Sequence, residues 1–526
     1  MHDYDAIVIG AGHNGLVCAG YLARSGLKVK ILERRPVVGG AAVTEEFHPG
    51  FRNSVYAYAV SLLHPDVIRD LELHRYGLEI IERPAGTISL LADDHLHLSR
   101  DPIQAREEVA RFSSIDAEQL IEFENRIIAV ASTLRELAVN TPPDISGGWR
   151  NALRLLKTGN SLRKLNPGQR GDLAELMTKS LGDYLDSWFE SEALKGILGL
   201  ECVIGNFVDP YQSGTAYVLL HHAFGEVNGR VGAWGHARGG MGAITQAMAA
   251  FAEAHGADIE TSAPVREICV EDRCAYGVIT EDGQKITARV IAGNVHPQIL
   301  LTKLLDPTLL PADTRRRIEA YRSHSATFRM NVALSELPRF TGIPDHSTEI
   351  FEGAIEICPS LEYMRKAYAT AQSRGWSEQP IISMWIPSTQ DTTLTPPGGH
   401  VASLFCQHFQ RHLPGGNSWD ERKEDVAEML IDTVNRYAPN FKASVLARQI
   451  KSPLDIERDL GMVGGDIFHG VLHLDQLFSL RPMVGYADYR MPVRALYLCG
   501  SGAHPGGGVS GLPGRNAALE ILRNIR

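Results

Sequence analysis

The stretch Ile9-Gly10-Ala11-Gly12-His13-Asn14-Gly15 decides the fold of this chain. It follows an apolar run, Tyr4 to Ile9, and leads into a segment with helical spacing, Asn14 to Ser25, and a second apolar run, Lys28 to Leu32. These patterns predict a strand, a helix and a second strand. In such a unit the first glycine permits a tight turn, the second lets the backbone approach a pyrophosphate, and the third lets helix and strand pack closely. The stretch therefore predicts a dinucleotide site at a helix N-terminus, where free N–H groups and the helix dipole favour phosphates.

Two features downstream select the dinucleotide. Glu33 ends the second predicted strand, where a carboxylate accepts hydrogen bonds from a ribose 2′-hydroxyl and disfavours a 2′-phosphate, so NADP is a poor candidate. Arg34 follows it, and then Gly39-Gly40, a continuation typical of FAD enzymes, whose second glycine pair again approaches the pyrophosphate and the ribityl chain. The pattern predicts FAD rather than NAD.

A second glycine-rich loop lies near the C-terminus. Leu496-Tyr-Leu-Cys-Gly-Ser-Gly-Ala-His-Pro-Gly-Gly-Gly-Val-Ser-Gly511 predicts a strand, a loop and the start of a helix that runs to about Arg523. Amides at such a helix start can face the flavin pyrimidine carbonyl and stabilise negative charge on the reduced ring. We therefore expect both chain ends to bind FAD, the C-terminal one through Gly500, Ser501, Gly508, Val509 and Gly511.

The pieces of this fold are separated by long insertions. A Gly239-Gly-Met-Gly242 turn precedes a predicted helix, Ala243 to His255, and three predicted strands, Ala263 to Val270, Cys274 to Thr280 and Lys285 to Ala292. We predict an α/β protein: a discontinuous Rossmann-like FAD-binding domain of the glutathione-reductase type with an inserted α+β substrate domain. The first comprises residues 1–100, 237–296 and 495–526, and the second comprises 101–236, mainly helical, and 297–494, with a helical lid or membrane-facing part.

Composition excludes several classes of protein. The formal net charge of −10 argues against a nucleic-acid binder, which needs a cationic surface. The cysteines lie singly, without C-x-x-C pairs or zinc-like spacing, so we expect buried thiols, no metal site and no disulfide reductase chemistry. The first predicted strand begins within a few residues of Met1 and no apolar run is long enough to span a membrane, so we expect a soluble cytoplasmic protein.

These motifs together resemble the phytoene desaturase-like FAD-dependent oxidoreductases. Within that family the chain is most similar to the group of pyridine nucleotide-disulfide oxidoreductase domain-containing protein 2, through Gly465-Asp-Ile-Phe-His-Gly470, Leu474-Asp-Gln-Leu477 and Cys499 to Gly508. The resemblance implies non-covalent FAD and removal or rearrangement of hydrogens on carbon skeletons. It implies that Gly10, Gly12 and Gly15 bind pyrophosphate, Glu33 the adenosine ribose, Val265 the adenine region, and the C-terminal loop the ribityl chain and flavin.

This sequence departs from the family pattern at two places. Ser501 stands where many related flavoproteins have an acid, and Ala41-Ala42 stand where a basic residue is common. No second strand-framed G-x-G-x-x-G occurs, so the electron acceptor is oxygen, a quinone or another protein, or is absent in a redox-neutral reaction.

Three residues are candidates for chemistry beside the flavin: His504, Tyr56 and His469. His504 lies in the flavin loop and either hydrogen-bonds the ring, acts as an acid or base, or only fixes the loop. Tyr56 follows the second glycine pair on a segment that runs beside the isoalloxazine in this family, although packing alone also explains it. His469 can line a cavity, as can His221-His222, and the alternative for each is a purely structural role.

Residues 149–171 form a basic segment with interleaved leucines and no acid. It either lies on an anionic membrane surface and admits a lipophilic substrate, or forms a solvated helix pair or lid. The leading functional hypothesis is a desaturase or dehydrogenase that moves a hydride between a largely apolar substrate and flavin N5. The alternatives are a flavin amine oxidase, a redox-neutral flavin isomerase and a non-catalytic escort-type protein of the same fold.

Overall fold

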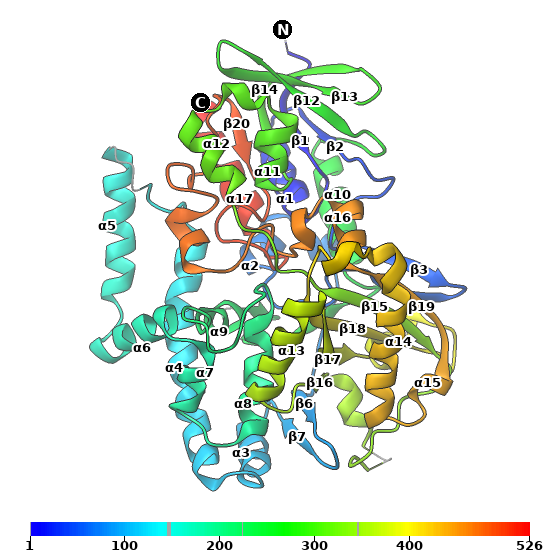
Figure 1. The fold of residues 1–526 in the computed structure, drawn as a ribbon. Coiled ribbons are helices and arrows are strands. Elements are labelled where there is room, and N and C mark those ends of the chain that lie inside the picture. Colours follow the sequence, from blue (N-terminus) through cyan, green and yellow to red (C-terminus); the bar gives the residue numbers. More distant parts are fainter. Residues whose placement is uncertain (1, 145–148, 224, 345–346, 526) are drawn as a thin grey trace.

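A mixed sheet, parallel at its centre, joins the two ends of the chain. The computed structural model describes residues 2–144, 149–223, 225–344 and 347–525. Both termini lie at this first sheet, near the top of Figure 1. Strands β1 (Tyr4–Ile9), β2 (Val29–Leu32) and β11 (Asp258–Glu260) run parallel, and β20 (Leu496–Leu498) pairs in parallel with the far end of β14 (Lys285–Gly293). The order is β11-β2-β1-β14-β13-β12, where β13 (Cys274–Thr280) and β12 (Val265–Glu271) are antiparallel.

The helices over this sheet pack unusually close to one another. Helix α1 (His13–Arg24) is buried along almost its whole length, between α10 (Gly242–Ala254) and α17 (Leu512–Ile525). A Cβ on Gly514 of α17 would lie 2.0 Å from the carbonyl oxygen of Asn14, so the two backbones touch. The strand, helix and turn positions predicted for these segments agree with the structure to within one or two residues.

The second sheet carries strands from two distant parts of the chain, residues 87–98 and 328–451. Its order is β19-β15-β18-β17-β16-β6-β7, and all its pairs are antiparallel except β16 with β6. The domain division proposed above assigned residues up to 100 to the first domain, but β6 and β7 pair within this second sheet. Its strands are β6 (Thr87–Leu90), β7 (His95–Leu98), β15 (Phe328–Leu334), β16 (Ala354–Ile357), β17 (Trp376–Trp385), β18 (His400–Phe409) and β19 (Val445–Lys451).

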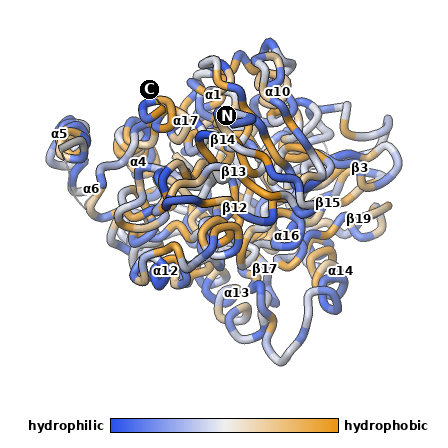
Figure 2. The backbone as a smooth tube through the Cα atoms, turned by 90° about the horizontal axis from the view of Figure 1, so that it is seen from above, coloured by the Kyte–Doolittle hydropathy of each residue, from blue (hydrophilic) through white to orange (hydrophobic). Residues whose placement is uncertain are grey.

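Helices cover the second sheet and form a separate layer beside it. Helix α14 (Trp419–Tyr437) packs its apolar residues onto β15, β17 and β18, and α13 (Leu361–Arg374) packs with the helical layer. Helix α5 lies at the edge of the molecule (Figures 1 and 2), where its polar side chains contact α4 and α17. The layer contains α3 (Pro102–Ala110), α4 (Ser114–Ala138), α5 (Trp149–Arg163), α6 (Pro167–Thr178), α7 (Leu181–Asp186), α8 (Glu192–Leu200) and α9 (Tyr217–Ala223).

The predicted α/β class is therefore confirmed, with mixed sheets. None of the helices in the described ranges has the length and apolar character needed to cross a membrane. All seven cysteines are free; five are buried, as predicted, whereas Cys269 and Cys274 are half-buried.

Candidate functional site

The glycine turn after β1 is shaped so that two backbones lie against each other. Gly10 has a φ of +95°, and a Cβ on Gly15 would lie 2.1 Å from the Gly10 carbonyl oxygen. Asn294, at the end of β14, donates its side-chain amide to that same carbonyl at 3.1 Å. The turn thus has no space for a side chain at either glycine, and its amides stay at the N-terminus of α1.

The second glycine pair packs directly on the first turn. The Gly39 amide donates to the Ala11 carbonyl at 2.8 Å, and a Cβ on Gly40 would lie 3.1 Å from the Gly12 Cα. Glu33 lies behind both, because one carboxylate oxygen accepts from the Ala11 amide at 2.8 Å and the other from the Arg35 amide at 2.9 Å. The carboxylate therefore fixes the turn and still borders the open space beside it.

This open space is one elongated cavity that runs from the glycine turn into the second sheet. Its volume is about 1850 Å³, including the part open to solvent. Four predicted cofactor glycines do not line the cavity and instead shape the turns behind it, namely Gly15, Gly39, Gly500 and Gly511. The predicted cofactor residues that line it are Gly10, Gly12, Glu33, Arg34, Gly40, Val265, Ser501, Gly508 and Val509.

The C-terminal glycine loop is held by a buried guanidinium. Arg481, which is fully buried, donates to the carbonyl oxygens of Ser501 at 2.9 Å, Phe468 at 2.7 Å and Gln476 at 3.1 Å. The Ser501 hydroxyl accepts from the Asn14 side-chain amide at 3.1 Å, so this serine ties the loop to α1. Loop and helix from the two chain ends thus form one wall of the cavity.

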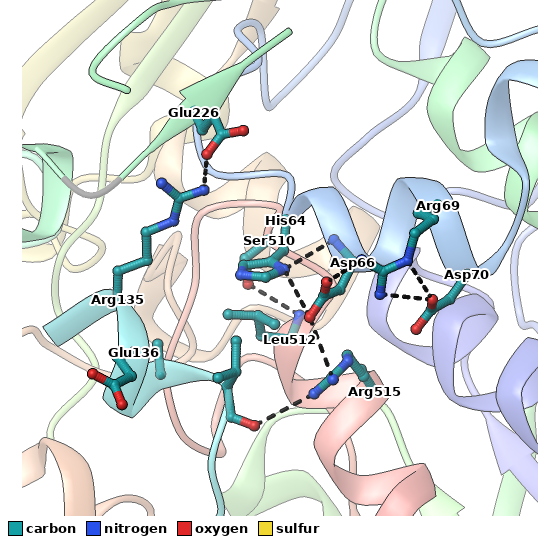
Figure 3. A network of polar contacts seen from close by, with 12 residues as sticks. His64, Asp66, Arg69, Asp70, Arg135, Glu136, Glu226, Ser510, Leu512 and Arg515 are labelled. Atoms are coloured by element: carbon teal, nitrogen blue, oxygen red, sulfur yellow. Dashed lines mark hydrogen bonds and ion pairs between the residues drawn. The ribbon is translucent and has the colours of Figure 1, made fainter. Parts of the chain in front are cut away.

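Polar contacts fix the far side of the same loop (Figure 3). The His64 amide donates to the Ser510 carbonyl at 3.1 Å, and Arg515 donates to Asp66 of α2 (Pro65–Asp70) at 3.5 Å. On the α4 side, Arg135 forms an ion pair with Glu226 of β8 (Glu226–Val227). The His64 amide therefore ties the loop to the start of α2, and Arg515 ties α17, which follows the loop, to the same helix.

Of the three predicted catalytic candidates, two line the cavity. Tyr56 does so, and its hydroxyl donates to Asp459 at 2.6 Å; burial and this carboxylate raise its pKa above the usual range. His469 also lines it, burial lowers its pKa to about 3, and its Nδ1 has no hydrogen-bond partner in the described residues. His469 is therefore a neutral imidazole at pH 7 with a free nitrogen.

His504 does not line the cavity. Its Nε2 donates to the Leu137 carbonyl of α4 at 3.4 Å, its ring packs edge-on against Phe478, and burial lowers its pKa to about 4. Of the roles left open above, fixing the loop is the one that this placement supports. His221 also lies outside this cavity, although its ring packs against Phe468, which lines it.

The wall formed by the second sheet holds residues that the sequence patterns did not single out. Arg329 on β15 is 2% exposed and lies over the rings of Tyr58 and Phe405, at 4.7 and 5.5 Å from their centroids. Thr327 immediately precedes the same strand. A charged residue inside the apolar run Phe328–Leu334 was the one available signal. Residues from other segments that line the same cavity are Ala57, Ala59, Leu62, Ile204, Trp234 and Ile467.

The end of the cavity at the glycine turn fits the pyrophosphate of a dinucleotide. His13 Nε2 is buried there and has no hydrogen-bond partner within the described ranges. A Cβ on Gly12 would meet the Asn294 side-chain amide at 2.9 Å, so the turn keeps its backbone open only as glycine. A buried ring nitrogen without a partner and a cradle without side chains are what a bound phosphate ligand would complete.

Comparisons with known proteins agree with this site. The model of the family "flavin containing amine oxidoreductase" matches residues 15–334. The rat "pyridine nucleotide-disulfide oxidoreductase domain-containing protein 2" is 39% identical over 100% of this chain and 94% of its own length. A limonene dehydrogenase subunit from Castellaniella defragrans is 26% identical, over 99% of this chain and 95% of that protein.

More distant likenesses extend over the whole chain. The lycopene-forming phytoene desaturase of a Paracoccus strain is 24% identical over 98% of this chain and 97% of that protein. The solved structure of wild-type putrescine oxidase bound to putrescine has a TM-score of 0.62 at 16% identity and covers 99% of both chains, which shows a shared fold. The resemblance stated from the glycine motifs is confirmed.

Proposed function

Because this chain belongs to the family of flavin-containing amine oxidoreductases and uses FAD, we propose that it is a dehydrogenase or desaturase of a largely apolar organic substrate. When bound, FAD supplies a ring whose N5 accepts a hydride from a substrate carbon. The remaining tasks fall to the protein, namely to hold the substrate carbon in position, exclude water and keep nearby polar groups in the required protonation state.

One observation supports the apolar substrate, namely the wall of the cavity at the second sheet. Phe405 of β18 lines the cavity there, together with Tyr58, Ile204 and Ile467, which belong to the same apolar cluster. A substrate with a carbon skeleton gains burial energy against such a wall, at about 25 cal/mol per Å² of apolar surface removed from water. The names of the limonene dehydrogenase and the phytoene desaturase describe hydrocarbon substrates, which supports the same substrate class here.

The polar residues of the cavity have roles that do not require them to titrate. The Tyr56 hydroxyl is engaged with Asp459, which also accepts from Lys451 at 2.6 Å, so this group orients the wall. His469 stays neutral and offers a free Nδ1 to a ligand. Gly10, Gly12 and Gly40 would hold the pyrophosphate, Glu33 the ribose and Val265 the adenine region.

Three alternatives remain, and substrate-driven reduction of the flavin separates them. The purified protein should be yellow, and under anaerobic conditions lipids or polyenes should bleach its visible absorbance whereas amines should not. Bleaching by amines instead would make it an amine oxidase, and product formed without net bleaching would make it an isomerase. A colourless protein that cannot be reconstituted with FAD would leave only the escort-type role. Oxygen, a quinone or a partner protein can then be compared as acceptor by the rate of reoxidation.

Helix α5 supports a second proposal, contact with a membrane that delivers the substrate. Leu153, Leu155 and Leu156 are 56%, 50% and 71% exposed, whereas Arg154 faces inward and pairs with Glu520 and Asp488. The leucines of α5 are therefore free to enter a lipid interface, whereas Arg154 is engaged within the protein.

Replacement of the three leucines of α5 by serine tests this contact. We expect the wild-type protein to co-sediment with vesicles that contain anionic phospholipid and the triple variant to bind at least ~10-fold more weakly, because each leucine loses about 1.5–3 kcal/mol of apolar burial. Leu446→Ser, at a residue that is 51% exposed on β19, is the matched control. Equal sedimentation of all three proteins would argue for a solvated helix or lid instead.

A further inference from the structure

Arg329 is a buried positive charge on the wall of the cavity. Its side chain comes from β15, in the middle of the second sheet, and is 2% exposed. Burial lowers the pKa of its guanidinium to about 10, while the Tyr58 phenol acts in the opposite direction. A group with this pKa remains charged at pH 7, so the cavity holds a cation whether or not a ligand is present.

The protein does not neutralise this charge. Arg329 Nη1 donates to the Leu404 carbonyl at 2.8 Å and Nη2 to the Ser403 hydroxyl at 2.7 Å, both neutral groups. Nε has no hydrogen-bond partner, and across the described residues no carboxylate forms an ion pair with this guanidinium. Because a guanidinium has five N–H donors, several remain for a ligand. Buried charges are ordinarily paired, so an unpaired one beside a cavity indicates that the partner comes from outside.

Thr327 adds a second unsatisfied group on the same side of the strand. It precedes Arg329 by two residues, which places both side chains on one face of an extended backbone. It is fully buried, its hydroxyl has no partner in the described parts of the chain, and both residues line the cavity. A planar fork and a hydroxyl on one wall match the oxygens of a carboxylate.

We infer that the substrate carries a carboxylate on its apolar skeleton, and that Arg329 and Thr327 bind this group on the wall formed by the second sheet. This inference rests on the proposed function and names the substrate class more narrowly. One guanidinium balances one negative charge, and the rings of Tyr58 and Phe405 lie against it and leave apolar surface for the carbon chain. The anionic end would then orient the skeleton in the cavity.

Binding of matched probes to the FAD-loaded protein tests the carboxylate site. Decanoate, decanol and decylamine have the same chain and differ only in the end group, and cyclohexanecarboxylate with cyclohexylmethanol repeats the comparison for a cyclic skeleton. We expect the acids to perturb the flavin absorbance and raise Tm at concentrations at least ~10-fold below those of the alcohols. Hydrogen bonds between charged groups are strong enough to give an affinity difference of this size. Acids that bind no better than the alcohols would overturn the inference without any variant.

Three variants locate the effect. Arg329→Met should cost at least ~10-fold in decanoate affinity and leave decanol unchanged, Arg329→Lys should give an intermediate loss, and Thr327→Val a smaller one. Arg83→Met is the matched control, because Arg83 is also buried, also lies over the Tyr58 ring and does not line the cavity. Equal losses in the Arg83 and Arg329 variants would contradict the site.

Failure of the inference and failure of the proposed function are distinguishable. If Arg329→Met alters the flavin spectrum without a ligand and leaves decanoate affinity unchanged, the guanidinium serves the cofactor and the carboxylate site is wrong, while the oxidoreductase proposal stands. If apolar compounds of every kind fail to bleach the flavin but the acids still bind selectively, the reaction proposal fails and the carboxylate site remains. A folding defect in Arg329→Met leaves the wild-type probe series and Thr327→Val as the deciding measurements.

Discussion

At the scale of single residues, Gly15 shows how sterics fix the cofactor turn. A Cβ there would lie 2.1 Å from the Gly10 carbonyl oxygen, a backbone atom that cannot move without opening the turn. We expect Gly15→Ala to be purified with less than a tenth of the flavin of the wild type and with a Tm lowered by several degrees. The flavin-to-protein absorbance ratio and a thermal melt measure both effects.

Gly159→Ala is the control for that substitution. Gly159 lies within α5, and a Cβ there would meet no atom within 4 Å. Alanine should therefore keep the flavin and stabilise the helix by about 0.5–1 kcal/mol. Full flavin content in Gly15→Ala would mean that α1 can shift on β1, against the close contact described above.

At the same scale, Arg329 shows what the sequence could not predict. The glycine positions follow from local rules of backbone geometry, which is why Gly10, Gly12, Glu33 and Gly40 line the cavity as expected. That Arg329 faces the same cavity depends on the pairing of β15 with β18 and β19, strands separated from it by dozens of residues. His504 was misleading for the same reason, because its loop also borders α4, which supplies its carbonyl partner.

At the scale of elements, Arg481 joins the C-terminal loop to the rest of the site. Its guanidinium donates to carbonyls of two loops, and no lysine can reach them all from one ammonium group. We expect Arg481→Lys to lower the free energy of unfolding by about 3–5 kcal/mol, since carbonyls and a charge are left buried without partners, and to release FAD more readily. Urea denaturation and flavin release by dialysis measure these losses.

Arg316→Lys is the matched control for that variant. The side chain of Arg316 is 78% exposed and pairs with Asp313 on α12 (Ala312–Glu319), where lysine keeps the charge. The change should stay within about 0.5 kcal/mol. If Arg481→Lys were equally mild, the loop would be held by its glycine packing alone.

The pairing of strands also explains why the domain boundary predicted from the sequence was misplaced. Periodicity located β1, α1, β2, α10 and α17, because each has an apolar pattern of its own. The strands β6 and β7 lie beside the same segment in the sequence, yet β6 pairs in parallel with β16, more than 250 residues away. The pattern of residues 87–98 does not identify that partner, because the fold of the intervening chain decides which strand lies beside β6.

At the scale of the whole molecule, buried imidazoles link stability to pH. Burial lowers the pKa of His13 and His504 to about 4, of His408 and His469 to about 3, and that of His296 well below its usual value. In the unfolded chain each would have a pKa near 6.5, so between pH 6.5 and 4 the unfolded state binds protons that the folded state does not. Stability is then fully present above about pH 6.5 and is lost as the pH falls.

Five carboxyls whose pKa burial raises oppose this trend but do not cancel it, namely Glu124, Glu201, Glu356, Asp466 and Asp488. Burial raises the pKa of Glu201 to about 7 and that of Glu356 well above its usual value, so the folded state holds protons there at a pH where the unfolded state has released them. In the described residues ten histidines have lowered pKa values against these five carboxyls, and each of the five imidazoles named above contributes about 1–2 kcal/mol between pH 7 and pH 5. We therefore expect the free energy of unfolding in urea to fall by at least ~3 kcal/mol from pH 7 to pH 5.

The variant His408→Asn tests this origin of the pH dependence. His408 lies away from the FAD cavity and has a positive φ that asparagine tolerates, so the substitution should reduce the fall by about 1 kcal/mol. Equal stability at pH 7 and pH 5, or an unchanged slope in His408→Asn, would mean that these imidazoles gain protons in the folded protein.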